Sequence, residues 1–321
     1  MRMRLHHIGT ALFVTVTLTA FCQDKNNSMK DFTEKVRINA STFHKNFSTG
    51  SFEKNGPLVT ENIYVNSNNS VLIGRENFVN RIKRYNGPFP GLQLRDRIVL
   101  IDGNVAAVHY ILQGVQKGAF GSIPASGNKV EAMSAEFFQM DNNALMKNLL
   151  TITQLDKLEA ECKGEVKIDN YQEVTLLPIS AKSDAFKMMI KDIMDEYMGA
   201  FNARKWDELG AMIDDNVTVN WNGETEGGKL ALMQHLKKYL AAFPDLTLQP
   251  DRNVADGDRG AIAYTMQGKQ AADLSINGTT LPAVGKTIMV REAEYFQFNN
   301  EGKITSVIAV SNSNDFITQL K

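Results

Sequence analysis

The chain has 321 residues, a formal net charge of −1 and only two cysteines. Such a balanced charge argues against nucleic-acid binding, which requires a clustered basic surface. The length fits about two domains, and a hydrophobic fraction of 43 % is sufficient for packed cores.

The first 22 residues have the pattern of an export signal. Arg2 and Arg4 form a short positive region, and a mostly apolar run of 14 residues extends from Ile8 to Phe21. This run is shorter than the ~20 residues that span a bilayer and has the length of a secretory signal core. We therefore expect residues 1–22 to be a signal peptide and the protein to be exported, either to a bacterial cell envelope or as a secreted protein.

Cys22 stands where the apolar run ends, and a polar stretch follows it. This arrangement resembles a bacterial lipoprotein signal, which implies that Cys22 is lipidated and anchors the chain to a membrane. Phe21 and the position of Leu18 depart from that pattern, so ordinary cleavage after Ala20 or Cys22 is the alternative. If Cys22 is lipidated or removed, Cys162 has no intramolecular disulfide partner.

After the signal, the chain repeats itself. Residues 89–116 align with residues 243–270, and 11 of these 28 positions are identical, where chance would give roughly two. The second copy gains four residues after Gln116, and "AEFFQ" (135–139) then matches "AEYFQ" (293–297). The sequence therefore predicts an internal duplication.

Each copy predicts the same order of elements. A long amphipathic helix comes first, with Asp184 as its predicted N-cap in copy two. A shorter helix, a short strand (217–221) and a third helix follow, and Pro244 stops the third helix. The pattern then alternates with period two in three strands: 260–268, 290–298 and 304–310.

We therefore predict an α+β fold of two tandem, cone-shaped barrel domains, each with three helices packed in a curved antiparallel sheet. The predicted boundaries are 28–159 for the first domain, 160–184 for a linker and 185–321 for the second domain.

The motifs "FPDL", "DGD" and "EYFQFNNEGKI" of copy two, with "FPGLQL" and "DGN" in copy one, resemble the SnoaL-like (polyketide cyclase-like) group of the nuclear-transport-factor-2-like superfamily. The resemblance covers both copies. It implies a bent sheet that wraps the long helix around a conical, largely apolar pocket. Cyclases and ketosteroid isomerases of this superfamily use a pocket carboxylate to move a proton next to a carbonyl.

The two copies depart from the family pattern in the same way. Gln116 and Gln270 stand where the family commonly has a histidine, and Thr153 and Ser311 stand where it has an acid. None of these side chains has a pKa suited to proton transfer near neutral pH. The family's usual acid–base mechanism therefore does not transfer to this chain.

One carboxylate pair is kept in register, Glu136 and Glu294. Within otherwise apolar strands, each could be a buried base with a raised pKa. The alternative is a solvated sheet residue, or one that pairs with a cation such as Arg291.

We expect Tyr110, Gln116, Tyr264, Gln270 and Trp221 to line ligand pockets. The alternative is that the tyrosines and Trp221 are ordinary core residues. Because Trp221 occurs only in copy two, opposite Ser67 in copy one, the two pockets should differ in size.

No metal site and no cofactor are expected. The histidines after the signal, His44, His109 and His235, lie in different elements without ligand spacing, and the sequence has no P-loop, dinucleotide fingerprint or nucleophile elbow.

The leading hypothesis is an exported, lipid-anchored protein that binds a small apolar or amphipathic molecule, with no nucleic-acid partner. The alternatives are a cyclase- or isomerase-like enzyme that uses Glu136 or Glu294 as the base, and a structural adaptor whose pockets are filled by side chains. The two domains are expected to dock as an intramolecular pseudo-dimer.

Overall fold

The computed structural model describes residues 9–276 and 279–321, with side chains described from Met29 onward. The side chains of the predicted signal peptide, including that of Cys22, therefore lie outside the described part of the chain, and the backbone of its residues 9–22 belongs to helix α1 (Gly9–Ser48). None of the described helices is both long and apolar enough to cross a membrane.

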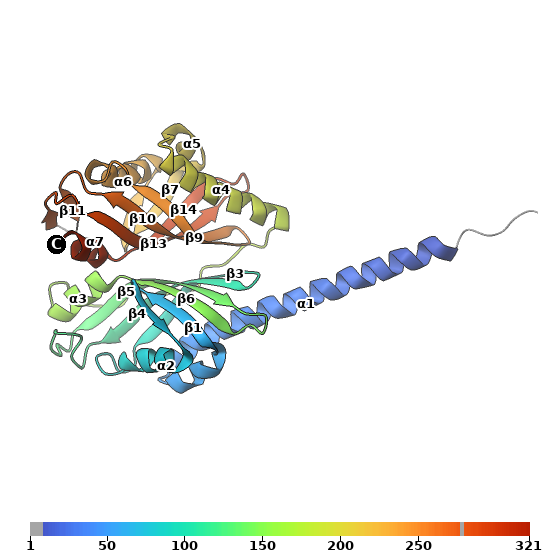
Figure 1. Cartoon of the computed structure of the whole chain (residues 1–321), viewed down its shortest axis with the longest axis horizontal. Helices are drawn as coiled ribbons and strands as arrows, with labels where there is room; N and C mark the ends of the chain where they lie inside the picture. The colour runs from blue at the N-terminus through green and yellow to red at the C-terminus, as the bar shows by residue number, and fades with distance from the viewer. Residues whose placement is uncertain (1–8, 277–278) are drawn as a thin grey trace, which may run out of the picture.

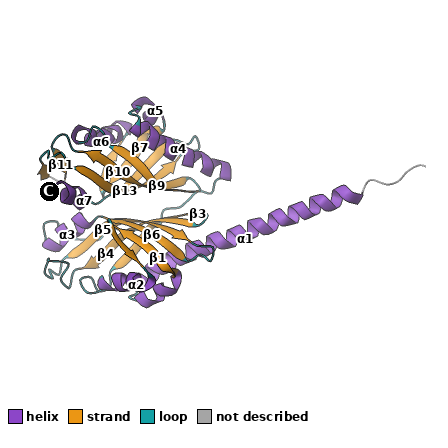
Figure 2. Ribbon diagram, viewed as in Figure 1, coloured by secondary structure: helices purple, strands orange, loops and turns teal. Residues whose placement is uncertain are grey.

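The N-terminal domain consists of one six-stranded sheet with helices α1 and α2 on the face that is turned away from the other domain (Figures 1 and 2). Its elements are α1 (Gly9–Ser48), the 3₁₀ helix η1 (Phe52–Leu58), β1 (Val59–Ser67), β2 (Ser70–Ile73), α2 (Arg75–Arg84), β3 (Gln93–Asp102), β4 (Val105–Val115), β5 (Lys129–Met140), β6 (Met146–Thr153) and α3 (Leu155–Lys163).

The C-terminal domain repeats this arrangement. Its elements are α4 (Asp184–Asn202), α5 (Trp206–Ala211), β7 (Ile213–Trp221), β8 (Glu224–Gly227), α6 (Lys229–Ala242), β9 (Thr247–Asp256), β10 (Arg259–Lys269), β11 (Leu274–Ile276), β12 (Thr279–Leu281), β13 (Thr287–Phe298), β14 (Ile304–Val310) and α7 (Ser313–Leu320).

The two large sheets have the same strand order, β2-β1-β6-β5-β4-β3 and β8-β7-β14-β13-β10-β9. The α+β class and the duplicated cone are as predicted, but the sheets are mixed rather than wholly antiparallel. β1 pairs with β6 in parallel, and β7 pairs with β14 in the same way. In each domain the last strand of the sheet in sequence, β6 or β14, lies beside the first strand, β1 or β7, and runs in the same direction.

Local signals set the helix ends. The Ser183 hydroxyl accepts a hydrogen bond of 3.2 Å from the backbone N–H of Phe186, so the cap of α4 is one residue earlier than the predicted Asp184. α6 ends at Ala242, shortly before Pro244, as expected. Helices α3 and α7, each after the last strand of its sheet, were not predicted.

A steric constraint accounts for two of the repeated glycines. A Cβ on Gly114 would lie 2.7 Å from Leu92 Cδ1, and a Cβ on Gly268 would lie 3.1 Å from the Cα of Leu246. Leu92 and Leu246 are themselves equivalent in the repeat. Glycine therefore lets the long central strand pass closely over the segment that follows the helix in both domains.

The outer faces of the two sheets pack against each other (Figure 1). Because side chains alternate along a strand, β4 sends Tyr110 and its even-numbered neighbours into the cone and Ala107 and Ile111 outward. The outward residues form a third apolar core between the domains, which includes Ile98, Leu100, Phe137, Ala261, Ala263, Tyr295 and Ile308.

Polar contacts around this core obey a pseudo-twofold symmetry. Asp102 accepts hydrogen bonds from Lys191 (2.7 Å) and from the N–H of Ala255 (3.3 Å). Its equivalent Asp256 accepts from Arg37 (3.3 Å) and from the N–H of Ile101 (3.0 Å). Since the partners are also equivalent in the repeat, each domain uses the same patch to contact the other.

Candidate functional site

An internal cavity of about 60 Å³ lies in the cone of the N-terminal domain. Its wall is mostly apolar and comes from helices α1, α2 and α3 and strands β1 and β3 to β6. The side chains of the cone therefore do not fill it completely. The apolar lining residues are Phe43, Phe47, Val65, Phe78, Ile82, Leu92, Leu94, Leu112, Leu149, Leu155 and Leu158; the polar ones are Ser67, Arg81, Tyr85, Tyr110, Glu136, Thr151 and Thr153.

Glu136 is the acidic residue of this wall, and it is 4 % exposed. Its Oε1 accepts hydrogen bonds from Tyr110 Oη (2.9 Å) and from Thr151 Oγ1 (3.3 Å). Its Oε2 lies 2.9 Å from His44 Nε2. Neighbouring strands and the long helix thus converge on one carboxylate.

His44 joins Glu136 to a second carboxylate. Its Nδ1 lies 2.5 Å from Asp96 Oδ1, on the other side of the ring. When both carboxyl groups are ionised they can only accept hydrogen bonds, and both ring nitrogens of His44 then donate as an imidazolium ion. Burial alone would lower the pKa of His44, but the hydrogen bonds to Asp96 and Glu136 raise it to about 9.

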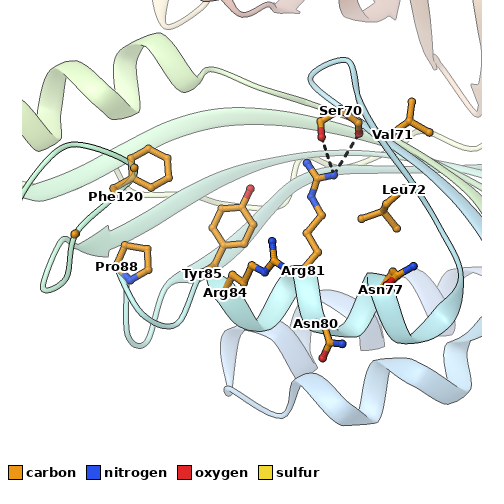
Figure 3. Close-up of a pocket in the computed structure, with 12 residues that line it drawn as sticks. Ser70, Val71, Leu72, Asn77, Asn80, Arg81, Arg84, Tyr85, Pro88 and Phe120 are labelled. Atoms are coloured by element: carbon orange, nitrogen blue, oxygen red, sulfur yellow. Dashed lines mark hydrogen bonds between the residues drawn. The ribbon is translucent and has the colours of Figure 1, made fainter.

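A larger, open pocket of about 640 Å³ adjoins the cavity, and we call it the vestibule. In Figure 3, Pro88 and Phe120 lie at one end, Val71 and Leu72 lie at the other, and the side chains of α2 lie between them. Arg81 and Tyr85 belong to the walls of both the vestibule and the cavity. The other lining residues are Ser70, Asn77, Asn80, Arg84, Ala119 and Gly121.

The cone of the C-terminal domain holds a void of only about 10 Å³, which is the size of one water molecule. Trp221 packs against His235 with ring centroids 3.7 Å apart, and both line the void with Tyr239, Tyr264 and Glu292. Aromatic side chains therefore fill the space that remains open in the first domain.

Among the described residues, no histidine is hydrogen-bonded to the buried acids of the second domain, Glu292 and Glu294. Tyr264 Oη lies 3.0 Å from Glu292 Oε2 and 2.9 Å from Glu294 Oε1. A hydroxyl has one proton to donate, so one of the two carboxyl groups must itself be protonated and donate to the tyrosine oxygen. Burial raises the pKa of Glu292 to about 7 and the pKa of Glu294 to about 8.

Three of the five predicted pocket residues line a cavity or void, and two do not. Tyr110 is in the wall of the cavity, and Trp221 and Tyr264 are in the wall of the smaller void. Gln116 and Gln270 line neither. Both are buried, but their amides hold loops in place.

Gln116 Nε2 donates to the carbonyl oxygen of Pro124 (3.0 Å), and its Oε1 accepts from Ser126 (2.6 Å). Gln270 Oε1 accepts from the N–H of Val284 (3.0 Å). These glutamines therefore fix the loops between the two long strands of each sheet, a role that their place near the end of the inner strand did not reveal.

The two predicted carboxylates also differ. Glu136 reaches the cavity, whereas Glu294 is buried at 0 % exposure and is not among the residues that line the void. The alternative partner considered for Glu294, Arg291, instead pairs with Asp251 at 3.4 Å.

The roles of His44 and Asp96 were not predicted from the sequence. His44 follows Phe43 and lies four residues after Ala40, so the helical period already places it on the buried face of α1. Its counterpart in copy two is Met198, which also suits a core position. Its partners, however, are 52 and 92 residues away, and only the folded sheet brings them together.

Within residues 29–276 and 279–321, no group of three or more histidine, cysteine or acidic side chains is arranged to hold a metal ion. His109 Nδ1 lies 2.9 Å from the Ser134 carbonyl oxygen in the interdomain core, and burial lowers the pKa of His109 to about 4.

Comparison with protein families gives one match in each half of the chain. A model of SnoaL-like polyketide cyclases matches residues 38–158, and a model of the SnoaL-like domain matches residues 194–307.

Among solved structures, a SnoaL-like polyketide cyclase from Agrobacterium tumefaciens is 26 % identical over 41 % of this chain and 98 % of its own, with a TM-score of 0.36. A nuclear-transport-factor-2-like protein from Exiguobacterium is 22 % identical over 37 % of this chain and 96 % of its own, with a TM-score of 0.31. A comparison with curated proteins found no match.

Proposed function

Because the chain consists of two tandem SnoaL-like domains of the nuclear-transport-factor-2-like superfamily, we propose that its N-terminal domain binds a small apolar or amphipathic molecule. One observation carries this proposal: the cone of that domain keeps an apolar cavity of about 60 Å³ that adjoins the open vestibule, whereas the equivalent cone is filled. Pockets for small ligands are typically of this mainly apolar kind with a few polar groups.

The size of the cavity limits what enters it. Known ligand sites measure about 300–1,000 Å³, so only a narrow apolar group fits the inner space and the rest of the ligand must occupy the vestibule. The hydroxyl groups of Ser67, Thr151 and Thr153 are polar groups in the wall of the cavity.

A neutral fluorescent reporter, N-phenyl-1-naphthylamine, tests the proposal. The wild-type protein should enhance its emission on binding. Ser67→Trp should abolish the enhancement, because it places in the first cone the tryptophan that occupies the equivalent position of the second cone. Met188→Trp adds a tryptophan at a side chain that is 62 % exposed on α4 and should bind the reporter like the wild type. Equal binding by Ser67→Trp and the wild type would contradict the proposal and favour an adaptor with filled pockets.

We also propose that the protein is exported and held to a membrane through Cys22. The support is the sequence pattern alone: Arg2 and Arg4, the apolar run from Ile8 to Phe21, and the cysteine at its end. Growth of the host with a radioactive fatty acid should label the wild-type protein and not Cys22→Ala. Equal labelling of both would exclude the anchor, and an unlabelled but shortened chain would indicate ordinary signal cleavage.

A second candidate function, proton transfer next to a carbonyl, is favoured by one observation. Glu136 lies in the cavity wall and is linked to His44 and Tyr110. Three hydrogen bonds already use most of the lone-pair sites of its two carboxylate oxygens, which favours binding over catalysis.

Deuterium exchange at the α-carbon of cyclohexanone, followed by NMR, tests this second candidate. Catalysed exchange that disappears in Glu136→Gln and persists in Glu294→Gln would support it. Exchange at the buffer rate in the wild-type protein would contradict it.

A further inference from the structure

The vestibule of the N-terminal domain has an uncompensated positive charge. Arg81 and Arg84 of α2 contribute to its wall, and none of its lining residues is acidic. Figure 3 shows both arginines beside Tyr85, between the apolar ends of the pocket.

The other cations of α2 are neutralised. Arg75 pairs with Glu61 at 2.9 Å, and Lys83 pairs with Glu53. In the described part of the chain, Arg84 has no ion-pair partner. One helix thus carries four cations, and the two without a carboxylate are those that face the vestibule.

Arg81 is held but not saturated. Its Nη1 donates to the carbonyl oxygen (3.2 Å) and the hydroxyl (3.4 Å) of Ser70. A guanidinium group has five N–H donors, so this contact fixes the side chain while other donors remain for a ligand. A planar guanidinium matches the two oxygens of a carboxylate or sulfonate group.

The arginines also stand at the boundary between two environments. Arg81 is part of both the vestibule and the apolar cavity. We propose that the vestibule binds the anionic head of an amphipathic organic acid, held by Arg81 and Arg84, while the apolar part of the same molecule enters the cavity. This inference rests on the proposed ligand-binding function and specifies the chemical class of the ligand.

The second domain supports the assignment by contrast. The equivalent of Arg81 is His235, which packs against Trp221 inside the filled cone. Where the cavity is closed, the cation at the position of Arg81 is replaced by a side chain that packs, whereas the equivalent of Arg84 is Lys238.

Two reporters that differ by one sulfonate group test the inference: 1-anilinonaphthalene-8-sulfonate and the neutral N-phenyl-1-naphthylamine. Arg84 is the residue to change, because it lines the vestibule and not the inner cavity. Arg84→Ala should weaken binding of the sulfonate at low salt about fivefold, and Arg84→Glu should weaken it further. Binding of the neutral reporter should change less than about twofold.

Lys83→Ala is the matched control. It removes the same charge from the neighbouring position of α2, but its side chain pairs with Glu53 outside the vestibule. It should leave the affinity for both reporters unchanged. Added salt should reduce the affinity for the sulfonate and not for the neutral reporter, since exposed charges are screened.

Three results would overturn the inference. If Arg84→Ala binds the sulfonate as tightly as the wild type, or weakens both reporters equally, the arginine does not recognise the anion and the ligand-binding function still stands. If Lys83→Ala weakens the sulfonate as much as Arg84→Ala, the effect comes from net charge rather than from the vestibule. If the wild-type protein binds neither reporter, the proposed function fails and the anion site fails with it.

Discussion

The two domains have the same strand order and use equivalent residues to contact each other, yet they differ inside their cones. Ser67 and Arg81 line the cavity of the first domain, whereas their equivalents Trp221 and His235 pack against each other in the second. Larger or packed side chains at equivalent positions can therefore fill an interior that the same backbone leaves open. The fold of a domain does not by itself determine whether it has a site.

The two domains also differ in the hydrogen-bond partners of their equivalent buried glutamates, Glu136 and Glu294. Glu136 is hydrogen-bonded to His44, a buried histidine whose pKa is raised to about 9. Its equivalent Glu294 shares Tyr264 with Glu292, where the first domain has Ser134. A buried acid without a cation favours its protonated form, and a buried acid beside one favours its ionised form.

This contrast predicts opposite effects of the same substitution, and these are the largest effects we expect. Glu136→Gln should lower the free energy of unfolding by about 3 kcal/mol at neutral pH, because it leaves a buried imidazolium with one partner fewer. Glu294→Gln should raise that free energy by about 1 to 2 kcal/mol at pH 8, because it removes the cost of ionising a buried acid. Urea denaturation of both variants measures the two effects.

The control for this pair is Glu226→Gln, at an exposed position of β8. It should change the free energy of unfolding by less than about 0.5 kcal/mol. If Glu136→Gln and Glu294→Gln shift stability in the same direction at pH 8, the proposed difference in charge between the two cones is wrong.

Trp221→Ser should open a cavity in the second cone like the one in the first, because serine is the residue at the equivalent position 67. Loss of a largely packed indole should lower the free energy of unfolding by about 3 kcal/mol and open a cavity beside His235. The variant should then bind more than one equivalent of N-phenyl-1-naphthylamine in a fluorescence titration. An unchanged stoichiometry would show that the second cone collapses around the vacant position.

Stability should also fall as pH rises, for two reasons that act in different windows. Glu292 and Glu294 have raised pKa values, so their contribution is complete below about pH 4.5 and is lost as pH rises through about 7 to 8. His44 has its pKa raised from 6.5 to about 9, so its contribution is complete below pH 6.5 and is lost as pH rises through about 9.

Denaturation curves from pH 5 to pH 9 separate the two contributions. His44→Asn should flatten the decline above about pH 7, and Glu294→Gln should flatten the decline below about pH 8. A wild-type stability that rises over this range would contradict both assignments.

The smallest effect should come from the interdomain aspartates. Asp102→Asn and Asp256→Asn should each lower the free energy of unfolding by about 1 kcal/mol, because each removes one partly exposed ion pair and keeps an acceptor for the backbone N–H. Equal effects from both would indicate that the pseudo-twofold contact persists in solution. A loss from only one of them would show that the two halves do not dock symmetrically.

Much of the fold could be predicted from the sequence, because its signals are local or repeated. The helical period of Phe186 to Phe201, the alternation along 260–268 and the stop at Pro244 each depend on neighbouring residues. The duplication then placed the same elements in both halves. The parallel pairing of β1 with β6 was missed, because nothing in a strand's alternation records the direction of a partner that is far along the chain.

The site was less accessible to sequence reasoning. Glu136 and Tyr110 were predicted as site residues because they recur in both copies, but His44, Asp96 and Arg81 differ between the copies and were not predicted. Their positions depend on tertiary contacts, such as the one between α1 and β3 that brings His44 to Asp96. A residue that departs from the repeat was thus as informative as one that keeps it.

The reciprocal contact of the two sheets has an evolutionary consequence. In a homodimer of one such unit, every substitution occurs in both subunits, so a tryptophan that closes one interior closes the other as well. When the two units are joined in a single polypeptide, a substitution in one unit no longer occurs in the other. One half can then become a support for its neighbour, and the neighbour is free to keep an open interior.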